Sequence, residues 1–386
     1  MKSLMWFRND LRMDDNPALR NACIESDEVH AIYIFSSKQN NFHNQANCKI
    51  EFVINNLKNL EKELSKINIP LTIIDSVGFD DNSDIILNLI KERSFNKVFW
   101  NNQFGIDEQK RDELVVRSFE INDVEFSSHD EKVIYPPGSI RTGEDKPYSV
   151  FTPFKKKWIE NFNLDFLDIE FKYVAKKKSL VVSNISEFDF KFKRNHSVDM
   201  SIWPSGEASA KNRLELYLSK NILRYSQDRN DPMIDGTSRI SPYLANGVIS
   251  PKRCILEALK INNFELDSGE KGITKWIDEI IWREFYKNIM YSFPKVSQGK
   301  PFQDYTNNIK WRYEKSELDA WKNGNTGFPI IDSAMRQLKS EGWMHNRLRM
   351  VVAMFFTKNM LHDWRIGEEF FMQNLIDGDF SSNNGG

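Results

Sequence analysis

The chain has 386 residues, of which 40% are hydrophobic and 28% charged, and its formal net charge is −2. This length is too great for one ordinary core, so we expect two domains, and the composition excludes a disordered or fibrous protein. The net charge is too small to indicate a nucleic-acid partner, so any such partner would need a local basic patch.

No segment of the sequence is typical of a membrane or secreted protein. The longest apolar run covers residues 350–356 and is far too short to cross a bilayer. Arg8 and Asp10 interrupt the N-terminus before the core of a signal peptide could form. The three cysteines are too far apart in the sequence to indicate a metal site or a redox pair. We therefore expect a cytoplasmic protein with no membrane partner and no metal.

Residues 1–130 alternate between short β-rich runs and helical ones. The segment 50–67 repeats apolar residues at three- and four-residue spacing, which is typical of a helix with one buried face. This alternation predicts an α/β domain with a doubly wound parallel sheet. The segment 8–19 after the first strand contains no glycine, which disfavours a nicotinamide-dependent dehydrogenase. The predicted strands are residues 4–7, 30–35, 71–74, 98–100 and 124–126.

The remainder of the chain divides into a connection and a helical part. Prolines at 136 and 137, Gly138 and the lysines at 176–178 interrupt any periodicity, so we expect residues 131–200 to form an interdomain linker. Residues 201–386 follow a helical pattern and contain six tryptophans between Trp276 and Trp364. We therefore expect an all-α second domain with more aromatic residues than packing alone requires.

Two segments of the helical part suggest a ligand site, and each has a simpler interpretation. Residues 236–241 place hydroxyls and an arginine after a glycine, which suits a phosphate group, although a plain helix cap has the same composition. On a helix, Trp276, Glu279 and Arg283 share one face, which suits a planar ligand that forms hydrogen bonds. The alternative there is a Glu279–Arg283 surface pair beside core tryptophans.

Two further segments are less informative by themselves. Residues 343–350 place Asn346 and Met350 one turn apart among arginines, which also fits a solvated basic helix. Residues 377–386 are acidic, loop-like and end in glycines, so they also fit a turn or a frayed end.

Five motifs in order resemble the photolyase and cryptochrome family. They are WFRNDLR at 6–12, GTSRIS at 236–241, WREFY at 282–286, GWMHNRLRM at 342–350 and DGDFSSNNGG at 377–386. The resemblance covers essentially the whole chain and implies an α/β antenna domain, a long linker and a helical domain that binds FAD. It also implies light-dependent DNA repair, in which photoexcited reduced FAD passes an electron to a cyclobutane pyrimidine dimer and recovers it after the dimer splits.

The resemblance assigns FAD contacts to many residues of the helical domain. The segment at 237–241 would hold the phosphates and sugar, and Arg349 and Asp377 would form a charged pair against the flavin ring. Asn383 would face flavin N5, where an amide can form a hydrogen bond without fixing one protonation state. The full set is Tyr225, Thr237, Ser238, Arg239, Ile240, Ser241, Trp276, Glu279, Arg283, Arg349, Asp377, Gly378, Asp379 and Asn383.

The same resemblance assigns contacts with UV-damaged DNA. Photolyases as a family are known to flip their target out of the duplex, and the resemblance implies the same step for this chain. Trp282 would stack on the flipped dimer, and Glu279 would bind its base edges. Met350 matches photolyases that act on cyclobutane dimers, because other branches of the family carry histidine or glutamine there. The implied DNA-binding residues are Arg229, Trp282, Arg283, Asn346, Arg347 and Met350.

Two features depart from the family pattern. His43 and Glu108 match positions that bind a methenyltetrahydrofolate antenna, but Asp107 and Gln298 replace an expected asparagine and lysine. Trp311 and Trp364 match two members of an electron-transfer chain, and the third tryptophan would follow Gly386.

We therefore expect an incomplete photolyase, with Glu279, Asn383, Trp311 and Trp364 as its catalytic residues, which retains FAD weakly. A monomer is expected from the resemblance. The alternatives are a cryptochrome-like blue-light photoreceptor, an inactive fragment, and a DNA- or nucleotide-binding module without catalysis.

Overall fold

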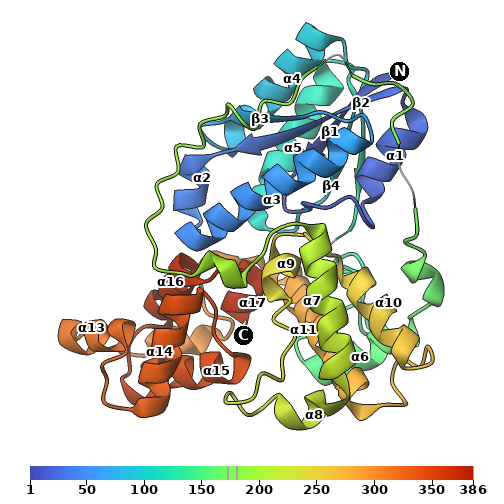
Figure 1. Cartoon of the computed structure of the whole chain (residues 1–386). Coiled ribbons are helices and arrows are strands. Elements are labelled where there is room, and N and C mark those ends of the chain that lie inside the picture. The colour runs from blue at the N-terminus through green and yellow to red at the C-terminus, as the bar shows by residue number, and fades with distance from the viewer. Residues whose placement is uncertain (132, 172–173, 180, 386) are drawn as a thin grey trace.

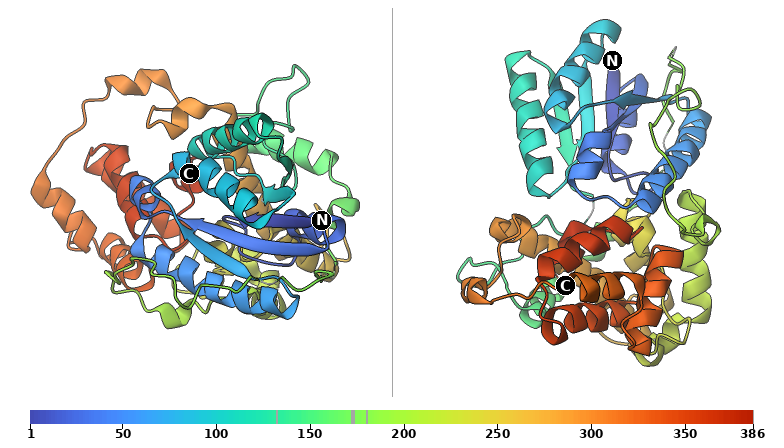
Figure 2. Two further views of the ribbon diagram at one scale, coloured as in Figure 1. Left: turned by 90° about the horizontal axis from the view of Figure 1, so that it is seen from above. Right: turned by 90° about the vertical axis from the view of Figure 1, so that its left-hand side faces the viewer.

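A computed structural model describes residues 1–131, 133–171, 174–179 and 181–385. It contains an α/β half and a helical half, which lie one above the other in Figure 1 and remain so after the quarter turn about the vertical axis in Figure 2.

Five parallel strands form the sheet of the α/β half. Their order is β3-β2-β1-β4-β5, and β1 lies at the centre with Leu4 opposite both His30 and Val98. Because every pair is parallel, each connection crosses over through a helical segment. The predicted doubly wound sheet is thus confirmed. The strands are β1 (Lys2–Phe7), β2 (Glu28–Phe35), β3 (Leu71–Asp75), β4 (Lys97–Asn101) and β5 (Glu125–His129).

Helices cover both faces of the sheet because successive residues of each strand point to opposite sides. Leu4 and Trp6 of β1 belong to one hydrophobic cluster, whereas Met5 and Phe7 belong to another. The second cluster continues into the helical half as far as Trp276, so one core joins the two halves. The helices are α1 (Pro17–Glu25), α2 (Ser37–Phe42), α3 (Asn47–Lys66), α4 (Asn82–Arg93) and α5 (Ile106–Ile121).

The segment 131–200, which we expected to be a linker, contains helix α6 (Phe151–Glu160) and a short 3₁₀ turn (Leu164–Leu167). Helix α6 packs against α11 (Lys271–Ser292). The buried carboxylate of Glu284 on α11 accepts hydrogen bonds from the backbone N–H groups of Ile134 and Tyr135 and from Nε1 of Trp158. This connection is therefore attached to the helical half by buried hydrogen bonds.

Helix α11 lies at the centre of the helical half and contacts α6, α8, α10, α12 and α17. None of the helices in the described part of the chain is both long and apolar enough to span a membrane. The other helices are α7 (Glu207–Lys220), α8 (Tyr225–Asp228), α9 (Ser241–Ala245), α10 (Pro251–Ile261), α12 (Pro294–Ser297), α13 (Lys315–Asn323), α14 (Pro329–Glu341), α15 (Asn346–Met354), α16 (Trp364–Asn374) and α17 (Phe380–Gly385).

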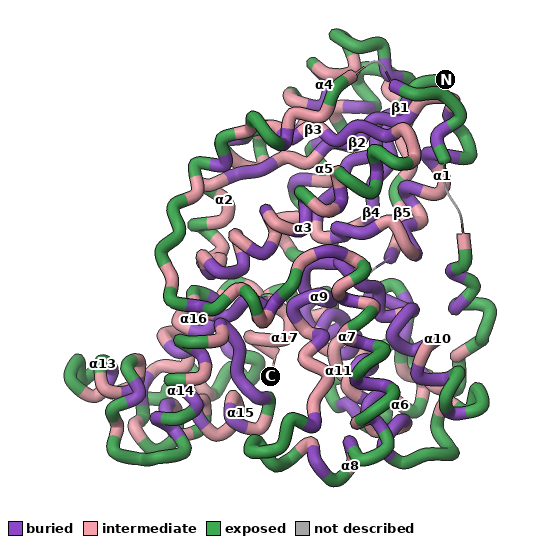
Figure 3. The backbone as a smooth tube through the Cα atoms, in the orientation of Figure 1, coloured by how far each residue is buried: buried purple, intermediate pink, exposed green. Residues whose placement is uncertain are grey.

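The two halves also meet through ion pairs and one glycine. Arg253 of α10 pairs with Asp14 of the α/β half at 2.8 Å, and Lys211 of α7 reaches the same carboxylate at 3.2 Å. Gly247 has a φ of +64°, and a Cβ there would lie 2.0 Å from the backbone oxygen of Asn9. Only glycine fits this approach. Figure 3 shows the buried backbone around α9, where the halves meet.

Candidate active site

A buried carboxylate, Asp377, lies where three elements of the helical half converge. Its Oδ2 accepts hydrogen bonds from Ser241 Oγ at 2.6 Å and from Arg349 Nη2 at 2.8 Å. Trp343 Nε1 donates to the same Ser241 oxygen at 3.1 Å. The Asp377 side chain is 3% exposed, and its Oδ1 has no hydrogen-bond partner among the described residues. The structure thus brings the predicted pair together and leaves one buried acceptor for a ligand.

The second acidic residue of this turn, Asp379, is held by α11. Lys287 Nζ lies 3.1 Å from Asp379 Oδ2, and the N–H of Ser382 donates to Oδ1 at 3.0 Å. Burial, the largest single effect, would raise the pKa of Asp379, but Lys287, Arg283 and the hydrogen bond from Ser382 together outweigh it, so this pKa falls well below its usual range. The carboxylate therefore remains charged at neutral pH.

The segment 236–241 forms a loop that ends on α9. Ile240 caps this helix, no side chain caps it, and Ser241 is its first residue. The plain-cap interpretation of the segment is therefore wrong, because the Ser241 hydroxyl donates to Asp377 instead. Arg239 has a φ of +48°, and its guanidinium pairs with Glu341 at 3.0 Å. A non-glycine residue in this region is uncommon and often marks a functional turn.

Aromatic side chains form the wall beside this loop. The indole of Trp276 is 2% exposed, and its Nε1 lies 3.3 Å from Ser238 Oγ. The ring of Tyr217 lies 5.7 Å from that indole and 6.3 Å from the ring of Tyr225. Aromatic side chains and the loop at 236–241, which the sequence analysis treated separately, are thus adjacent.

Glu279 lies at the edge of the same wall. Its carboxylate pairs with Arg229 at 2.5 Å, which favours this partner over the surface pair with Arg283 that the spacing also allowed. Burial raises the pKa of Glu279, although Arg229 opposes the rise. The Arg283 guanidinium donates to the backbone oxygen of Leu244 at 3.3 Å. Arg229 is thus paired with Glu279, and Arg283 is held by the backbone of α9.

The remaining residues predicted to contact DNA are partly or fully exposed. Trp282 stacks on Phe151 of α6, with ring centroids 3.7 Å apart and planes 9° apart. Asn346 and Met350 are exposed on α15, and Arg347 donates to Asn230 at 2.6 Å. One face of the Trp282 indole is therefore covered by a phenyl ring.

The remaining predicted catalytic residues are Asn383, Trp311 and Trp364, and they come from separate segments of the helical half. The Asn383 amide on α17 donates to the backbone oxygen of Glu368 at 3.1 Å, so in this structure it is directed towards α16. A bridge between Arg312 and His362 brings the segments that carry Trp311 and Trp364 side by side. The roles of these three residues stay predictions.

The predicted antenna residues line a cavity of about 860 Å³ between the two halves. His43 lies 3.3 Å from Asp107 and 3.9 Å from Glu108. Gln298 faces the same cavity from the helical half, and Gly378 and Asp379 form part of its wall. Residues from positions 43, 107, 108 and 298 are thus brought together.

Sequence reasoning missed several residues that complete the site. Lys287 lies one turn beyond Arg283 on the same face of α11, so its spacing could have revealed it. Trp343 belongs to a quoted motif but was given no role. Phe151 and Lys49, whose Nζ lies 2.5 Å from the Gly378 oxygen, had no local signal because they come from distant segments.

Comparison with known proteins agrees with this fold. Residues 3–172 match the family model "DNA photolyase", and residues 276–386 match "FAD binding domain of DNA photolyase". The chain therefore belongs to the DNA photolyase family, whose helical domain binds FAD. A solved class III photolyase from Agrobacterium tumefaciens has a TM-score of 0.89 at 28% identity, covering 100% of this chain and 78% of that one.

The curated relatives are deoxyribodipyrimidine photo-lyases. The protein from Buchnera aphidicola is 38% identical, covering 100% of this chain and 79% of its own length. The protein from Escherichia coli is 37% identical, covering 99% of this chain and 80% of its own length. A Synechocystis cryptochrome with a TM-score of 0.84 is only 23% identical, so it supports the fold alone.

Proposed function

We propose that this chain is a deoxyribodipyrimidine photo-lyase, which uses light and FAD to split cyclobutane pyrimidine dimers in UV-damaged DNA. The observation that carries the proposal is the buried cluster of Ser241, Trp343, Arg349 and Asp377, which leaves one carboxylate oxygen without a partner among the described residues. A buried acceptor of this kind fits a ligand that brings its own N–H or O–H donor. Reduced FAD, when bound, would supply the photoexcited electron that splits the dimer.

The residues present fit the flavin along its length. Tyr225 and the loop at 237–241 would hold the phosphates and the sugar, where backbone N–H groups and Arg239 offer donors and positive charge. Trp276 would cover the ligand and exclude water. Asp377, with its charge fixed by Arg349, would hold the ring, and Asp379 would remain ionised beside it because Lys287 and Arg283 lower its pKa.

The DNA face would hold a dimer that has left the duplex. Trp282 offers one face for stacking because Phe151 covers the other. Arg229 and Glu279 are paired in the chain without DNA, and we infer that they separate on binding. Arg229 would then contact a phosphate, and Glu279 would bind base edges, while Arg283, Asn346, Arg347 and Met350 would position the strand.

We further propose that the interdomain cavity holds a methenyltetrahydrofolate antenna. Its volume of about 860 Å³ is within the range of small-molecule sites, and His43 and Glu108 line its wall. Asp107 and Gln298 differ from the residues expected there, so we expect weak binding. Absorption in the near ultraviolet beyond that of flavin, after the folate is added, would reveal it.

We also propose that the protein acts as a monomer in the cytoplasm. Its three cysteines are free and buried, which suits a reducing compartment. Light scattering of the purified chain at several concentrations would test the oligomeric state.

The first experiment supplies the purified chain with FAD and a reductant and follows a thymine dimer in an oligonucleotide under blue light. Added reductant removes any need for electron transfer through Trp311 and Trp364, so the assay tests the cavity itself. We expect dimer loss in light and none in the dark. Bound flavin without dimer loss would favour a photoreceptor, and failure to bind flavin would favour a DNA-binding module without catalysis.

A further inference from the structure

Each of the three residues in the turn at 377–379 is held by side chains from other elements. Ser241 and Arg349 hold the Asp377 carboxylate, and Lys287 of α11 holds the Asp379 carboxylate. Between them, the backbone oxygen of Gly378 accepts a hydrogen bond of 2.5 Å from Lys49 Nζ. Lys49 belongs to α3 of the α/β half, so the third support comes from the other side of the domain boundary.

Lys49 is buried, with 7% of its surface exposed, and lies in the first turn of α3. Burial lowers its pKa, and the charges of Asp379 and Asp377 oppose that change. A buried ammonium group is costly unless its charge and donors are used, and an apolar residue would serve packing alone better. The position therefore uses the charge and the hydrogen bond of lysine.

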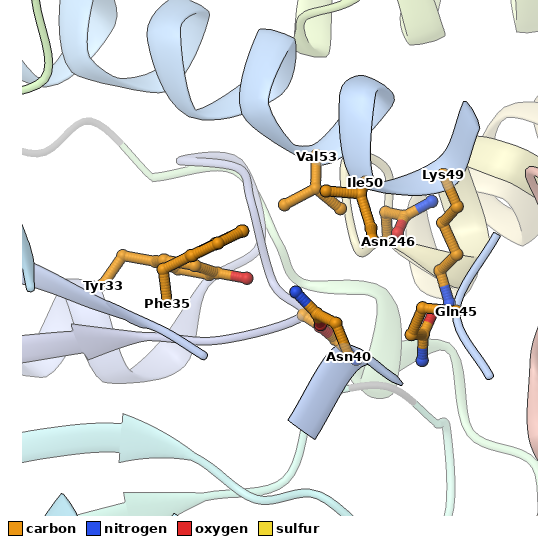
Figure 4. A pocket seen from close by; sticks show the side chains of 9 residues that line it. Tyr33, Phe35, Asn40, Gln45, Lys49, Ile50, Val53 and Asn246 are labelled. Carbon is orange, nitrogen blue, oxygen red and sulfur yellow. The ribbon is translucent and has the colours of Figure 1, made fainter. Parts of the chain in front are cut away.

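Lys49 lies beside two cavities and close to the segment that leads into the turn. It lines a small cavity of about 50 Å³ with Asn40 and Gln45, and Figure 4 shows its side chain extending from α3 at the edge of that cavity. It also lines the large interdomain cavity. The preceding residue, Cys48, points its Sγ to the backbone oxygen of Asn374 at 3.6 Å. The start of α3 thus rests directly on the segment that leads into the turn.

We propose that Lys49 is a positioning residue for the flavin, which fixes the Gly378 peptide and through it the carboxylates of Asp377 and Asp379. This inference rests on the proposed FAD contacts of those two residues. Glycine has no side chain to limit its backbone rotation, so the peptide that follows it needs an external hydrogen bond to keep one orientation. Rotation of that peptide would move Asp379 relative to Asp377.

Through Lys49, the α/β half would help to hold FAD whether or not an antenna molecule is bound. The flavin site is complete only when α3 is docked on the helical half. Lys49 does not touch the reacting atoms and acts through Gly378 alone.

The test replaces Lys49 by methionine and measures the rate of FAD release from the chain of residues 1–386 after reconstitution with FAD. Asp14→Asn is the matched control, because it weakens the interdomain pairs with Arg253 and Lys211 without touching the turn. We expect Lys49→Met to release FAD about tenfold faster, which corresponds to a lost hydrogen bond from a charged group. Lys49→Arg should restore most of the retention. Asp14→Asn should change FAD release much less than Lys49→Met does, because Asp14 pairs with Arg253 and Lys211 rather than with the turn.

Amide hydrogen exchange of residues 376–382 provides a second readout, which reports on the turn itself. Exchange there should be faster in Lys49→Met and unchanged in Asp14→Asn. A second variant, Lys49→Gln, keeps a neutral hydrogen-bond donor and serves if Lys49→Met does not fold. Its rate of FAD release should lie between those of the wild type and Lys49→Met.

Equal FAD release from Lys49→Met and Asp14→Asn, or no change in either, would overturn the inference. Asp377→Asn separates this result from failure of the proposed site. If Asp377→Asn loses FAD while the Lys49 variants keep it, only the role of Lys49 is wrong. If Asp377→Asn also retains FAD like wild type, the proposed flavin contacts themselves are wrong.

Discussion

The turn at 377–379 and the His43 wall (His43, Asp107 and Glu108) both border the interdomain cavity, yet their polar side chains have different kinds of partner. At the turn, Asp377 and Asp379 lie 2.8 Å and 3.1 Å from Arg349 and Lys287. At the wall, His43 lies 3.3 Å and 3.9 Å from Asp107 and Glu108, and the Asp107 side chain is 35% exposed.

This difference separates a preorganised site from an adaptable one. Each carboxylate of the turn contacts an arginine or a lysine, which keeps one geometry before a ligand arrives. Asp107 and Glu108 instead contact a histidine at longer distances, and such contacts contribute less. We therefore expect substitutions near the turn to have large effects on stability and flavin retention, and substitutions at the wall to have small ones.

The largest effect is expected from Asp379→Asn. The substitution leaves Lys287 buried without its carboxylate, and an uncompensated buried charge costs about 3–5 kcal/mol. The temperature of thermal unfolding and the FAD content of the purified protein should both fall. Glu63→Gln, which breaks the exposed pair with Lys66, should change stability by less than about 0.5 kcal/mol. Equal effects of the two variants would remove the contrast between buried and exposed pairs.

Next in size is the pH dependence contributed by Glu284. Burial raises its pKa from 4.5 to about 7, despite hydrogen bonds from Ile134, Trp158 and Tyr135. Between these two pH values the folded protein keeps a proton on Glu284 that the unfolded chain has lost. The contribution of Glu284 to the free energy of unfolding therefore falls as pH rises from about 4.5 to about 7, and it stays constant above pH 7. The fall is on the order of 3 kcal/mol.

Urea unfolding of wild type and Glu284→Gln at pH 5 and pH 8 tests this sign. The stability of wild type relative to the variant should decrease between the two values. A difference that does not depend on pH would show that Glu284 has the same pKa in the folded and unfolded states.

A smaller effect is expected from Phe151→Leu at the DNA face. An aromatic pair contributes about 0.5–1.5 kcal/mol beyond its buried area, so Trp282 should lose its fixed orientation. Affinity for an oligonucleotide with a dimer should fall about threefold to tenfold, with FAD content unchanged. Phe162→Leu, which removes a similar stack on Trp158, is the control. Equal losses of affinity in both variants would mean that only general packing was disturbed.

The smallest effect is expected from His43→Ala at the wall. His43 is partly exposed, and its shortest hydrogen bond is to Gln39, one turn earlier in the chain. Thermal stability should therefore change by less than about 0.5 kcal/mol, and FAD release should change little. Near-ultraviolet absorption after addition of methenyltetrahydrofolate should decrease. A large loss of FAD in this variant would show that the wall is as preorganised as the turn.

Much of the fold could be predicted because its patterns are local. The alternation in residues 1–130 reflects strands and helices that each bury one face, and the sheet follows from it. Trp276, Glu279 and Arg283 could be placed on one side of a helix by spacing alone. Arg349 and Asp377 needed the family resemblance, because no periodicity connects positions 28 residues apart.

The rest depended on contacts between distant segments. Glu279 has Arg283 at the right spacing for a pair, but the fold gives it Arg229, 50 residues away. Ser241 has the composition of a helix cap, yet its hydroxyl is used by Asp377. Lys49 lies 329 residues from Gly378, and a solvated lysine on α3 was an equally good interpretation until the two halves were placed together.

Helix α11 carries Trp276, Glu279, Arg283 and Lys287 on one side, and their contacts are Ser238, Arg229, Leu244 and Asp379 in turn. With a rise of 1.5 Å per residue, the first and last of these are about 16 Å apart along the axis. A single inserted residue after Ile280 would rotate everything beyond it by about 100° and separate Lys287 from Asp379. The number of residues between these four side chains therefore sets where the surrounding segments can contact α11. A substitution would disturb one of these contacts, whereas an insertion or deletion would disturb every contact beyond it.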